Sequence, residues 1–408
     1  MTELGEAKRG GMFRSLSNRN ARLFFAGLLF SNIGSWLQLT ATSILLYRLT
    51  GSSVDLGINA ALQFLPTLIL GAWAGAFSDR FDRRRTTVIT QSLMAVQAIV
   101  LGVCDVTGVI NVRMVFVLTG CLGLISAIDN PSRRGLVTEL VPAHEIGNAM
   151  SLNTAVMTGS RIFGPALAAM LVGPLGTGWL FIINGISYAF MLYGITGLRK
   201  SEMFTPEPRP AGGTPVRDGI RFVRTHHRLF PLFIVFTIVS TFAFNYGVSL
   251  PKLADLKWGN AEYYGWILAM TSVGSLIGAL STARLQLTTY KWVASAALIL
   301  GVANIGMAVA PNVWIAFIWA VPLGAGGAAM IAGANSIITH EAPPDMRGRM
   351  LALTAVAFLG STPIGGPITG WIADNIGVSW SLAYGGIITL VAGVYMFAWL
   401  LMKRIDHV

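Results

Sequence analysis

Arg161 is the one arginine or lysine in the middle of a long apolar segment. It lies in the stretch TGSRIFGPALAAML, residues 158–171, where small and apolar side chains surround it. A charge in an apolar medium costs a few kcal/mol or more unless it has partners. A guanidinium at this position can therefore bind a substrate or take part in coupling, which we favour. The open alternative is a structural residue bonded to helix-end carbonyls or neighbouring amides.

Asp129 is the second residue with a possible chemical role. It stands just before Pro131, near the end of an apolar run, and no carboxylate lies at the centre of any such run. A carboxylate here can carry a proton. The alternative is an ordinary ion pair with Arg133 or Arg134. Because a buried acid is missing, we expect anionic or neutral, bulky and partly apolar ligands rather than cations.

Several uncharged polar and aromatic side chains also interrupt the apolar runs. Such groups line a water-filled path or hold helices together. The candidates for a cavity are Asn32, Trp36, Gln38 and Gln63.

The patterns that mark enzymes and metal sites are missing from the sequence. The dipeptide Gly-Lys does not occur, which excludes the G-x-x-x-x-G-K-[ST] phosphate loop. The five histidines fall in polar stretches, and no His, Cys or carboxylate cluster has metal-ligand spacing. The sequence predicts no metal, no cofactor and no enzymatic activity.

The elements that must position these residues are membrane helices. The chain of 408 residues is 54% hydrophobic and 12% charged, about half the charged fraction of a soluble protein. A helix of roughly 20 apolar residues spans the hydrocarbon core of a bilayer. We expect an all-α membrane protein with twelve such helices, at 23–48, 55–78, 86–107, 111–131, 146–173, 177–198, 229–252, 261–285, 290–310, 313–337, 347–373 and 378–402.

The basic residues indicate how these helices are oriented. The formal net charge is +11, and most lysines and arginines fall in segments that would lie on one side of the membrane. The other side receives Arg48, Arg113, Lys252 and Lys257. By the positive-inside rule both termini are cytoplasmic. The charge therefore predicts orientation in an inner or plasma membrane, not nucleic-acid binding.

A polar break divides the chain into two halves. Residues 199–215 are rich in proline and glycine, as in a flexible linker. The arginine-rich piece that follows has apolar residues at helical spacing and predicts an amphipathic helix on the inner membrane surface. We expect a six-helix bundle at 1–198, a linker with this helix at 199–228, and a second bundle at 229–408.

The two halves repeat each other at an offset of 201 residues. Gly164 matches Gly365, and Gly176 matches Gly377, but Thr362 stands where the first half has Arg161. Six helices separate the equivalents, so both halves have the same orientation in the membrane. Two parallel six-helix repeats with a site between them near the midplane are typical of secondary transporters.

The strongest local pattern is GAWAGAFSDRFDRRR, residues 71–85. It resembles the loop 2–3 motif of the major facilitator superfamily, G-x-x-x-D-R-x-G-R-R, with Asp82 in place of the usual glycine. The residues that match the motif are Gly75, Asp79, Arg80, Arg83 and Arg84.

The resemblance implies that Asp79 latches the inner side by pairing with the start of helix 11. The stretch PPDMRGRM, residues 343–350, offers Asp345 as an N-cap and Arg347 and Arg349 as partners. An arginine and a helix N-terminus both attract a carboxylate.

Other stretches narrow the resemblance to one branch. SNIGSWLQ, NPSRRGLVTELVP and RGRMLAL are similar to the enterobactin-exporter-like, or transmembrane secretion effector, group. GSRIFGPALAA resembles the helix 5 motif of exporters through Gly164 and Pro165, with Gly159 one residue early. In this superfamily helix 1 lines the central cavity, which favours Trp36 and Gln38 as site residues.

The resemblance implies a monomeric exporter in the lipid bilayer that moves a siderophore-like or hydrophobic drug-like molecule by alternating access, with proton antiport. Two alternatives stay open: an importer of a small solute, and a membrane sensor that uses the same fold without moving anything.

Overall fold

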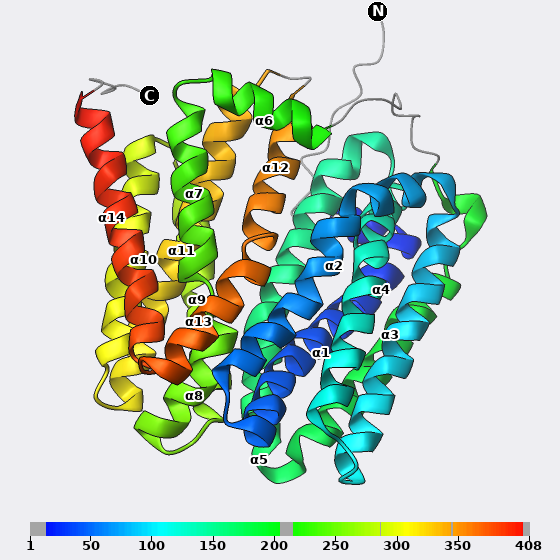
Figure 1. Cartoon of the computed structure of the whole chain (residues 1–408). Helices are drawn as coiled ribbons and strands as arrows, with labels where there is room; N and C mark the ends of the chain where they lie inside the picture. Colours follow the sequence, from blue (N-terminus) through cyan, green and yellow to red (C-terminus); the bar gives the residue numbers. More distant parts are fainter. Residues whose placement is uncertain (1–13, 205–214, 286, 344–345, 403–408) are drawn as a thin grey trace, which may run out of the picture.

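The computed structural model is a bundle of long helices (Figure 1). It describes residues 14–204, 215–285, 287–343 and 346–402, and it describes the backbone alone at 71–80, 215–218, 348, 352 and 359. Over these ranges the chain forms fourteen α-helices and no strand. The predicted all-α membrane fold is confirmed, since eleven segments of the described chain are long and apolar enough to cross a membrane.

The first half begins with a short 3-10 helix, Arg14–Ser17. Its long helices are α1 (Arg19–Thr50), α2 (Ser53–Arg80), α3 (Arg83–Val106), α4 (Val112–Thr138) and α5 (Ile146–Thr196), with a 3-10 turn at Ala143–Glu145. The 51 residues of α5 are far longer than one crossing of the roughly 30 Å hydrocarbon core requires. Gly176 has φ 77° and breaks the helical path, so α5 supplies two crossings and the bundle has twelve.

A 3-10 turn at Lys200–Glu202 precedes the second half. Its helices are α6 (Pro215–Thr225), α7 (Leu229–Ala243), α8 (Tyr246–Trp258), α9 (Tyr263–Ala283), α10 (Tyr290–Val309), α11 (Val313–Glu341), α12 (Arg347–Leu359), α13 (Thr362–Asn375) and α14 (Trp380–Met402).

The structure corrects two predicted helices, which are interrupted. The segment 229–252 breaks between α7 and α8, where the Asn245 amide donates to the Thr241 oxygen at 2.7 Å and competes with the backbone ladder. The segment 347–373 breaks between α12 and α13, just before Pro363. Proline lacks an N–H, and its ring clashes with the carbonyl four residues earlier.

Glycine makes the turns at one end of the bundle. The positive-φ glycines of the described chain all lie in turns at the end opposite α6, which we call the outer end: Gly51, Gly108, Gly176, Gly259 and Gly377. Only glycine adopts this conformation without strain. The repeat pair Gly176 and Gly377 therefore makes equivalent turns in the two halves.

The α6 helix covers part of the opposite end, which we call the inner end (Figure 1). Val223 is 5% exposed and α6 packs against α12, while Arg221 and Arg224 are exposed. The predicted amphipathic helix is present, and its place on the membrane surface stays a prediction.

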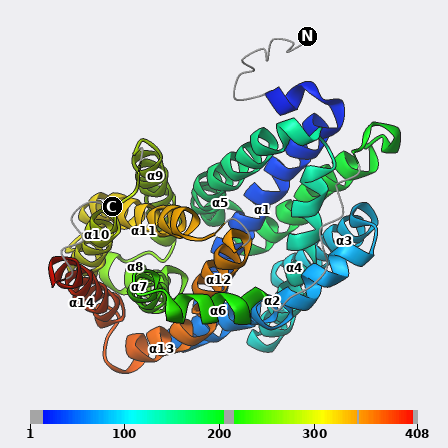
Figure 2. The ribbon, with the colours of Figure 1, turned by 90° about the horizontal axis from the view of Figure 1, so that it is seen from above.

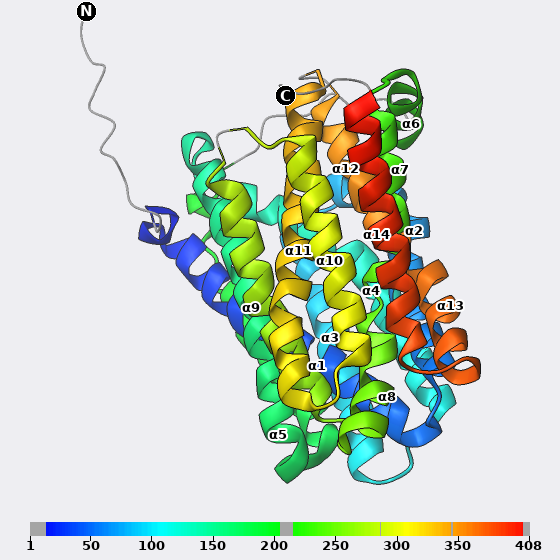
Figure 3. The same cartoon turned by 90° about the vertical axis from the view of Figure 1, so that its left-hand side faces the viewer.

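Each half has its own packing pairs. α1 and α3 pack against α5, and α2 packs against α4. In the second half α11 packs against α9 and α10, and α14 packs against α10 and α7. Figure 2 shows these two groups side by side, and Figure 3 shows α9, α10, α11 and α14 on one face. Contacts between the groups are made mainly by α2 with α13 and by α5 with α9. We keep 1–198 and 229–408 as the proposed bundle limits.

The outer end is held closed by Asp374, the carboxylate at the end of α13. It accepts hydrogen bonds from the backbone N–H groups of Ser53 (2.9 Å) and Val54 (3.0 Å) at the start of α2. The Ser52 hydroxyl donates at 2.8 Å, and Lys252 pairs with it at 2.5 Å. An anion at a helix N-terminus is favourable. The carboxylate therefore joins the two halves and anchors α2.

A second polar contact joins the halves nearby. The Tyr47 hydroxyl at the end of α1 donates to Asp255 of α8 at 2.9 Å. About one turn along α2 from the Asp374 contact, α2 and α13 lie backbone to backbone, because a Cβ on Gly57 would meet the Gly366 carbonyl carbon at 2.6 Å.

We predict that Asp374→Ala destabilises the fold by about 2 kcal/mol, because it leaves partly buried donors unpaired. Asp55→Asn is the matched control. Asp55 lies in the first turn of α2, the helix that Asp374 contacts, and its side chain forms no hydrogen bond or ion pair with another described residue. Thermal unfolding in detergent measures both. Equal unfolding midpoints for the two variants would contradict the role given to Asp374.

Candidate functional site

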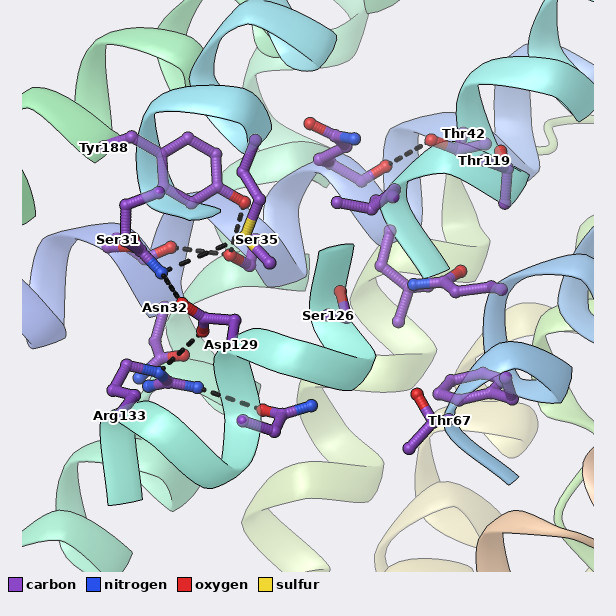
Figure 4. Close-up of a pocket in the computed structure, with 18 of the residues that line it drawn as sticks. Ser31, Asn32, Ser35, Thr42, Thr67, Thr119, Ser126, Asp129, Arg133 and Tyr188 are labelled. Carbon is purple, nitrogen blue, oxygen red and sulfur yellow. Dashed lines mark hydrogen bonds and ion pairs between the residues drawn. The ribbon is translucent and has the colours of Figure 1, made fainter. Parts of the chain in front are cut away.

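A polar cavity lies inside the first half, and we call it the N-half cavity. Its volume is about 220 Å³, and residues of α1 to α5 line it. Figure 4 shows the polar side chains that point into it. Four predicted site residues come together in this lining: Asn32, Gln38, Gln63 and Asp129.

Asp129 is held by hydrogen-bond donors within this cavity. The residue is 2% exposed, and its carboxylate accepts from Thr90 at 2.7 Å and Gln91 at 3.0 Å. Arg133, one turn along α4, pairs with the other carboxylate oxygen at 3.1 Å (Figure 4). The pairing with Arg133 that the sequence offered as an alternative is therefore present. The carboxylate is therefore both hydrogen-bonded and ion-paired inside the cavity.

A chain of amides ties α1 to its neighbours. Gln38 donates to Gln97 of α3 at 3.1 Å and accepts from Asn184 of α5 at 2.6 Å. Asn32 donates weakly to the sulfur of Met157 at 3.3 Å. Gln38 thus holds three helices together as well as lining the cavity, and both roles suggested by the sequence fit its position.

A smaller cavity lies between the two halves, and we call it the interface cavity. Its volume is about 90 Å³, and its lining comes from α1 and α5 on one side and α8, α9, α11 and α12 on the other. The guanidinium carbon of Arg161 lies 5.1 Å from the centre of the Trp36 ring, a cation–π contact. Arg161 and Trp36 therefore lie together, in a different cavity from Gln38 and Asp129.

The helix 5 motif positions Arg161 against α1. A Cβ on Gly164 would lie 2.8 Å from the Ile33 oxygen and 3.0 Å from the Leu37 nitrogen, so only glycine allows this approach. Pro165 lines the interface cavity. Gly159 has open space where a side chain would be. Of the two motif glycines, only Gly164 is required by packing.

Two predicted gating arginines make contacts inside the first half. Arg83 pairs with Glu139 at the end of α4 at 3.0 Å. Burial raises the pKa of the Glu139 carboxyl, and Arg83 opposes that rise. Arg84 donates to the carbonyls of Ile195 (3.0 Å) and Thr196 (2.6 Å) at the end of α5. These contacts fix the start of α3 to the inner ends of α4 and α5.

The remaining gating residues are placed only in part. Gly75, Asp79 and Arg80 lie in the last turns of α2, and their side chains are outside the described residues. Asp345 also lies outside them, and the residue that directly precedes α12 is Met346. Arg347 donates to the Ala342 oxygen at 3.4 Å and Arg349 contacts the Met346 sulfur at 3.6 Å. The inner latch stays a prediction.

Sequence reasoning missed the partners of these residues. Thr90 and Gln91 could have been predicted as partners, because they are adjacent polar residues in the apolar part of α3. The contacts of Asp374 and Lys252 could not have been predicted, because only the folded chain brings α13 to the start of α2. Among the described residues no group of three His, Cys, Asp or Glu side chains could hold a metal ion.

Comparison with known proteins places the whole chain in one family. The family model for transmembrane secretion effectors matches residues 11–407. An uncharacterized MFS-type transporter of Bacillus subtilis, YfiS, is 26% identical and the match covers 89% of each chain. The staphyloferrin A transporter of Staphylococcus aureus is 23% identical over 90% of this chain and 93% of its own. The multidrug efflux pump Tap of Mycolicibacterium fortuitum is 25% identical over 87% and 89%.

Solved transporters share the fold. A POT family transporter in complex with 5-aminolevulinic acid has a TM-score of 0.75 at 13% identity, covering 94% of this chain and 96% of its own. A bacterial homolog of the lysosomal transporter Spinster, in an inward-facing and occupied conformation, has a TM-score of 0.70 at 14% identity, covering 95% and 97%. At these identities the likeness concerns the fold alone.

We predict that Gly164→Ala destabilises the protein by about 1–3 kcal/mol, the usual cost of overpacking. The new methyl group would collide with Trp36 and the backbone of α1. Gly159→Ala, five residues away on the same helix, adds a methyl group in open space and should leave the unfolding midpoint unchanged or higher. Equal losses in both variants would show that Gly164 packs less tightly than described.

Proposed function

The chain belongs to the transmembrane secretion effector family of the major facilitator superfamily, and from that premise we propose that it exports a small organic molecule by alternating access, driven by protons. Members of this family are multi-pass membrane transporters, not enzymes. The proposal concerns direction, substrate and coupling.

The interface cavity is the observation that carries the proposal. It is lined by both halves of the chain, and alternating access requires a site that each half contacts in turn. The outer end beside it is closed by the contacts of Asp374 and Tyr47. A molecule would therefore enter this state from the inner end and leave after the outer contacts separate.

The inner end supplies the opposing latch in this proposal. Asp79, at the end of α2, would pair with Arg347 or the start of α12 when the inner end closes. The α2 helix would then contact the chain at 347–375 by its first turn in one state and by its last turn in the other. Arg83 and Arg84 support the proposal by fixing the neighbouring loop to α4 and α5.

Asp129 is the proposed proton carrier. It is the carboxylate that lines the N-half cavity, and it pairs with Arg133 at 3.1 Å. Proton uptake would weaken that pair and the hydrogen bonds that join Asp129 of α4 to Thr90 and Gln91 of α3. Repeated pairing and separation would couple proton movement to the rocking of the first half.

The substrate class follows from names of relatives and is a proposal. One relative is named a staphyloferrin A transporter and another a multidrug efflux pump. We propose a siderophore-like or hydrophobic drug-like substrate. We further propose a monomer in the cell membrane with both termini in the cytoplasm.

Flux into inverted membrane vesicles tests this function. The panel is a catecholate, a macrolide and a cationic dye, each with and without an imposed pH gradient. We expect accumulation of at least one compound that requires an acidic vesicle interior. Movement in the opposite direction only would identify an importer, and no movement of any compound by folded protein would favour a sensor.

We predict that Asp129→Asn removes the pH-gradient dependence of flux and leaves the protein folded. An asparagine can still accept from Thr90 and Gln91, but it cannot exchange a proton. Asp105→Asn is the matched control, because Asp105 is also paired with an arginine, Arg48 at 2.9 Å, near the outer end. Unchanged gradient dependence in Asp129→Asn would exclude Asp129 as the carrier.

A further inference from the structure

Arg161 lacks an acidic partner in the interface cavity. Its side chain lines the cavity and is exposed, and the described lining contains no aspartate or glutamate. Its guanidinium lies over the face of Trp36. A guanidinium has five N–H donors and no acceptor, so a single ring face leaves most of its donors for water or a ligand.

The other polar groups of the cavity add one more donor. The Tyr246 hydroxyl is buried and has no hydrogen-bond partner. The Asn304 side chain interacts with it; the Asn304 amide N–H donates to the Leu300 oxygen at 3.1 Å, so a ligand would compete with the Asn304 carbonyl oxygen for the hydroxyl. The cavity hydroxyls of Ser272 and Ser275 already donate to helix carbonyls. The donors of Arg161 and Tyr246 therefore favour a ligand that carries a negatively charged hydrogen-bond acceptor.

Aromatic rings form the rest of the wall. Phe244 and Phe358 lie edge to face with centroids 5.3 Å apart, and Phe244 also lies beside Tyr246 at 6.1 Å. Trp36 stands on the other side of the cavity, on α1. Rings in these positions favour a flat apolar or aromatic body next to the charged group.

We propose that the interface cavity is a carboxylate-binding subsite, in which Arg161 and the Tyr246 hydroxyl bind the carboxylate and Trp36, Phe244 and Phe358 pack against an apolar body. The proposal rests on the proposed transport function and specifies its substrate as an organic acid. One guanidinium matches one carboxylate in charge and in planar, bidentate geometry. A doubly charged phosphate would keep an uncompensated charge in an apolar surrounding.

The size of the cavity sets the extent of the subsite. Whole drug-sized ligands need about 300–1,000 Å³, and the interface cavity has about 90 Å³. It therefore holds the charged end of the molecule and part of its body. Thr362, the repeat equivalent of Arg161, shows that the second half offers no corresponding cation, so the acid binds in one orientation.

Equilibrium dialysis with the purified full-length chain tests the subsite. The probes are 1-naphthylacetate and its neutral amide, which match in size and differ in charge. Because a hydrogen bond to a charged group contributes about 1.5–3 kcal/mol, we expect the acid to bind about tenfold tighter than the amide or better. Equal affinities of acid and amide would overturn the proposal.

Variants test whether Arg161 and Tyr246 cause the preference for the acid over the amide. We expect Arg161→Gln to abolish the acid preference, Arg161→Lys to keep part of it, and Tyr246→Phe to weaken acid binding by about threefold, the loss of one modest hydrogen bond. Arg113→Gln removes a charge from an exposed outer position and should change nothing. Undiminished acid preference in Arg161→Gln would overturn the proposal. If Arg161→Gln does not fold, unchanged acid binding by Tyr246→Phe would overturn it.

The binding test and the flux test can reject the carboxylate subsite and the transport function independently. The flux panel for this comparison also includes 1-naphthylacetate. Acid binding without flux of 1-naphthylacetate or any other compound would support the subsite and reject transport. Flux of neutral or cationic compounds by a chain that binds acid and amide equally would support transport and reject the subsite.

Discussion

A hydrocarbon surrounding offers no hydrogen bonds, and this constraint governs every polar group in the bundle. Asp129 meets it with Thr90, Gln91 and Arg133, and Gln38 meets it through amides on two neighbouring helices. At the outer end, Asp374 meets it with the first turn of α2 and Lys252. Arg161 differs from these groups, since it faces a ring and a cavity whose described lining has no acidic residue. The paired groups hold the helices in place, and the guanidinium of Arg161 is the proposed ligand contact.

The two halves share a scaffold and differ in chemistry. Gly164 lets α5 approach α1, and its repeat partner Gly365 lies against Thr241 of α7 in the same way. Gly176 and Gly377 then turn the chain at equivalent points. The polar cavity belongs to the first half alone in the described chain, and so does Arg161. In the proposed cycle the shared scaffold would let the two halves move as units, while the charged and polar groups of the first half would bind substrate and protons.

Much of the fold could be predicted, because apolar length and glycine turns are local features. The membrane crossings and the polar candidates Asn32, Gln38, Gln63 and Asp129 follow from the sequence, whereas the grouping of these four in one cavity comes from the structure. Trp36 and Gln38 were expected in one central cavity, but residues two apart on a helix point about 200° from each other, and they face different cavities. The break at Asn245 and the contacts of Asp374 depend on helices that meet only in the folded chain. No local pattern contains that information.

The most direct test of the two-ended account is a pair of spin-label distances in one cysteine-free background. Labels at Val109 and Asn375 span the outer end, and labels at Arg85 and Arg224 span the inner end; Val109, Asn375, Arg85 and Arg224 are all exposed. Changing the pH or adding a transported compound should lengthen the outer distance and shorten the inner one together. Distances that stay fixed, or that change in the same direction at both ends, would contradict alternating access by this chain.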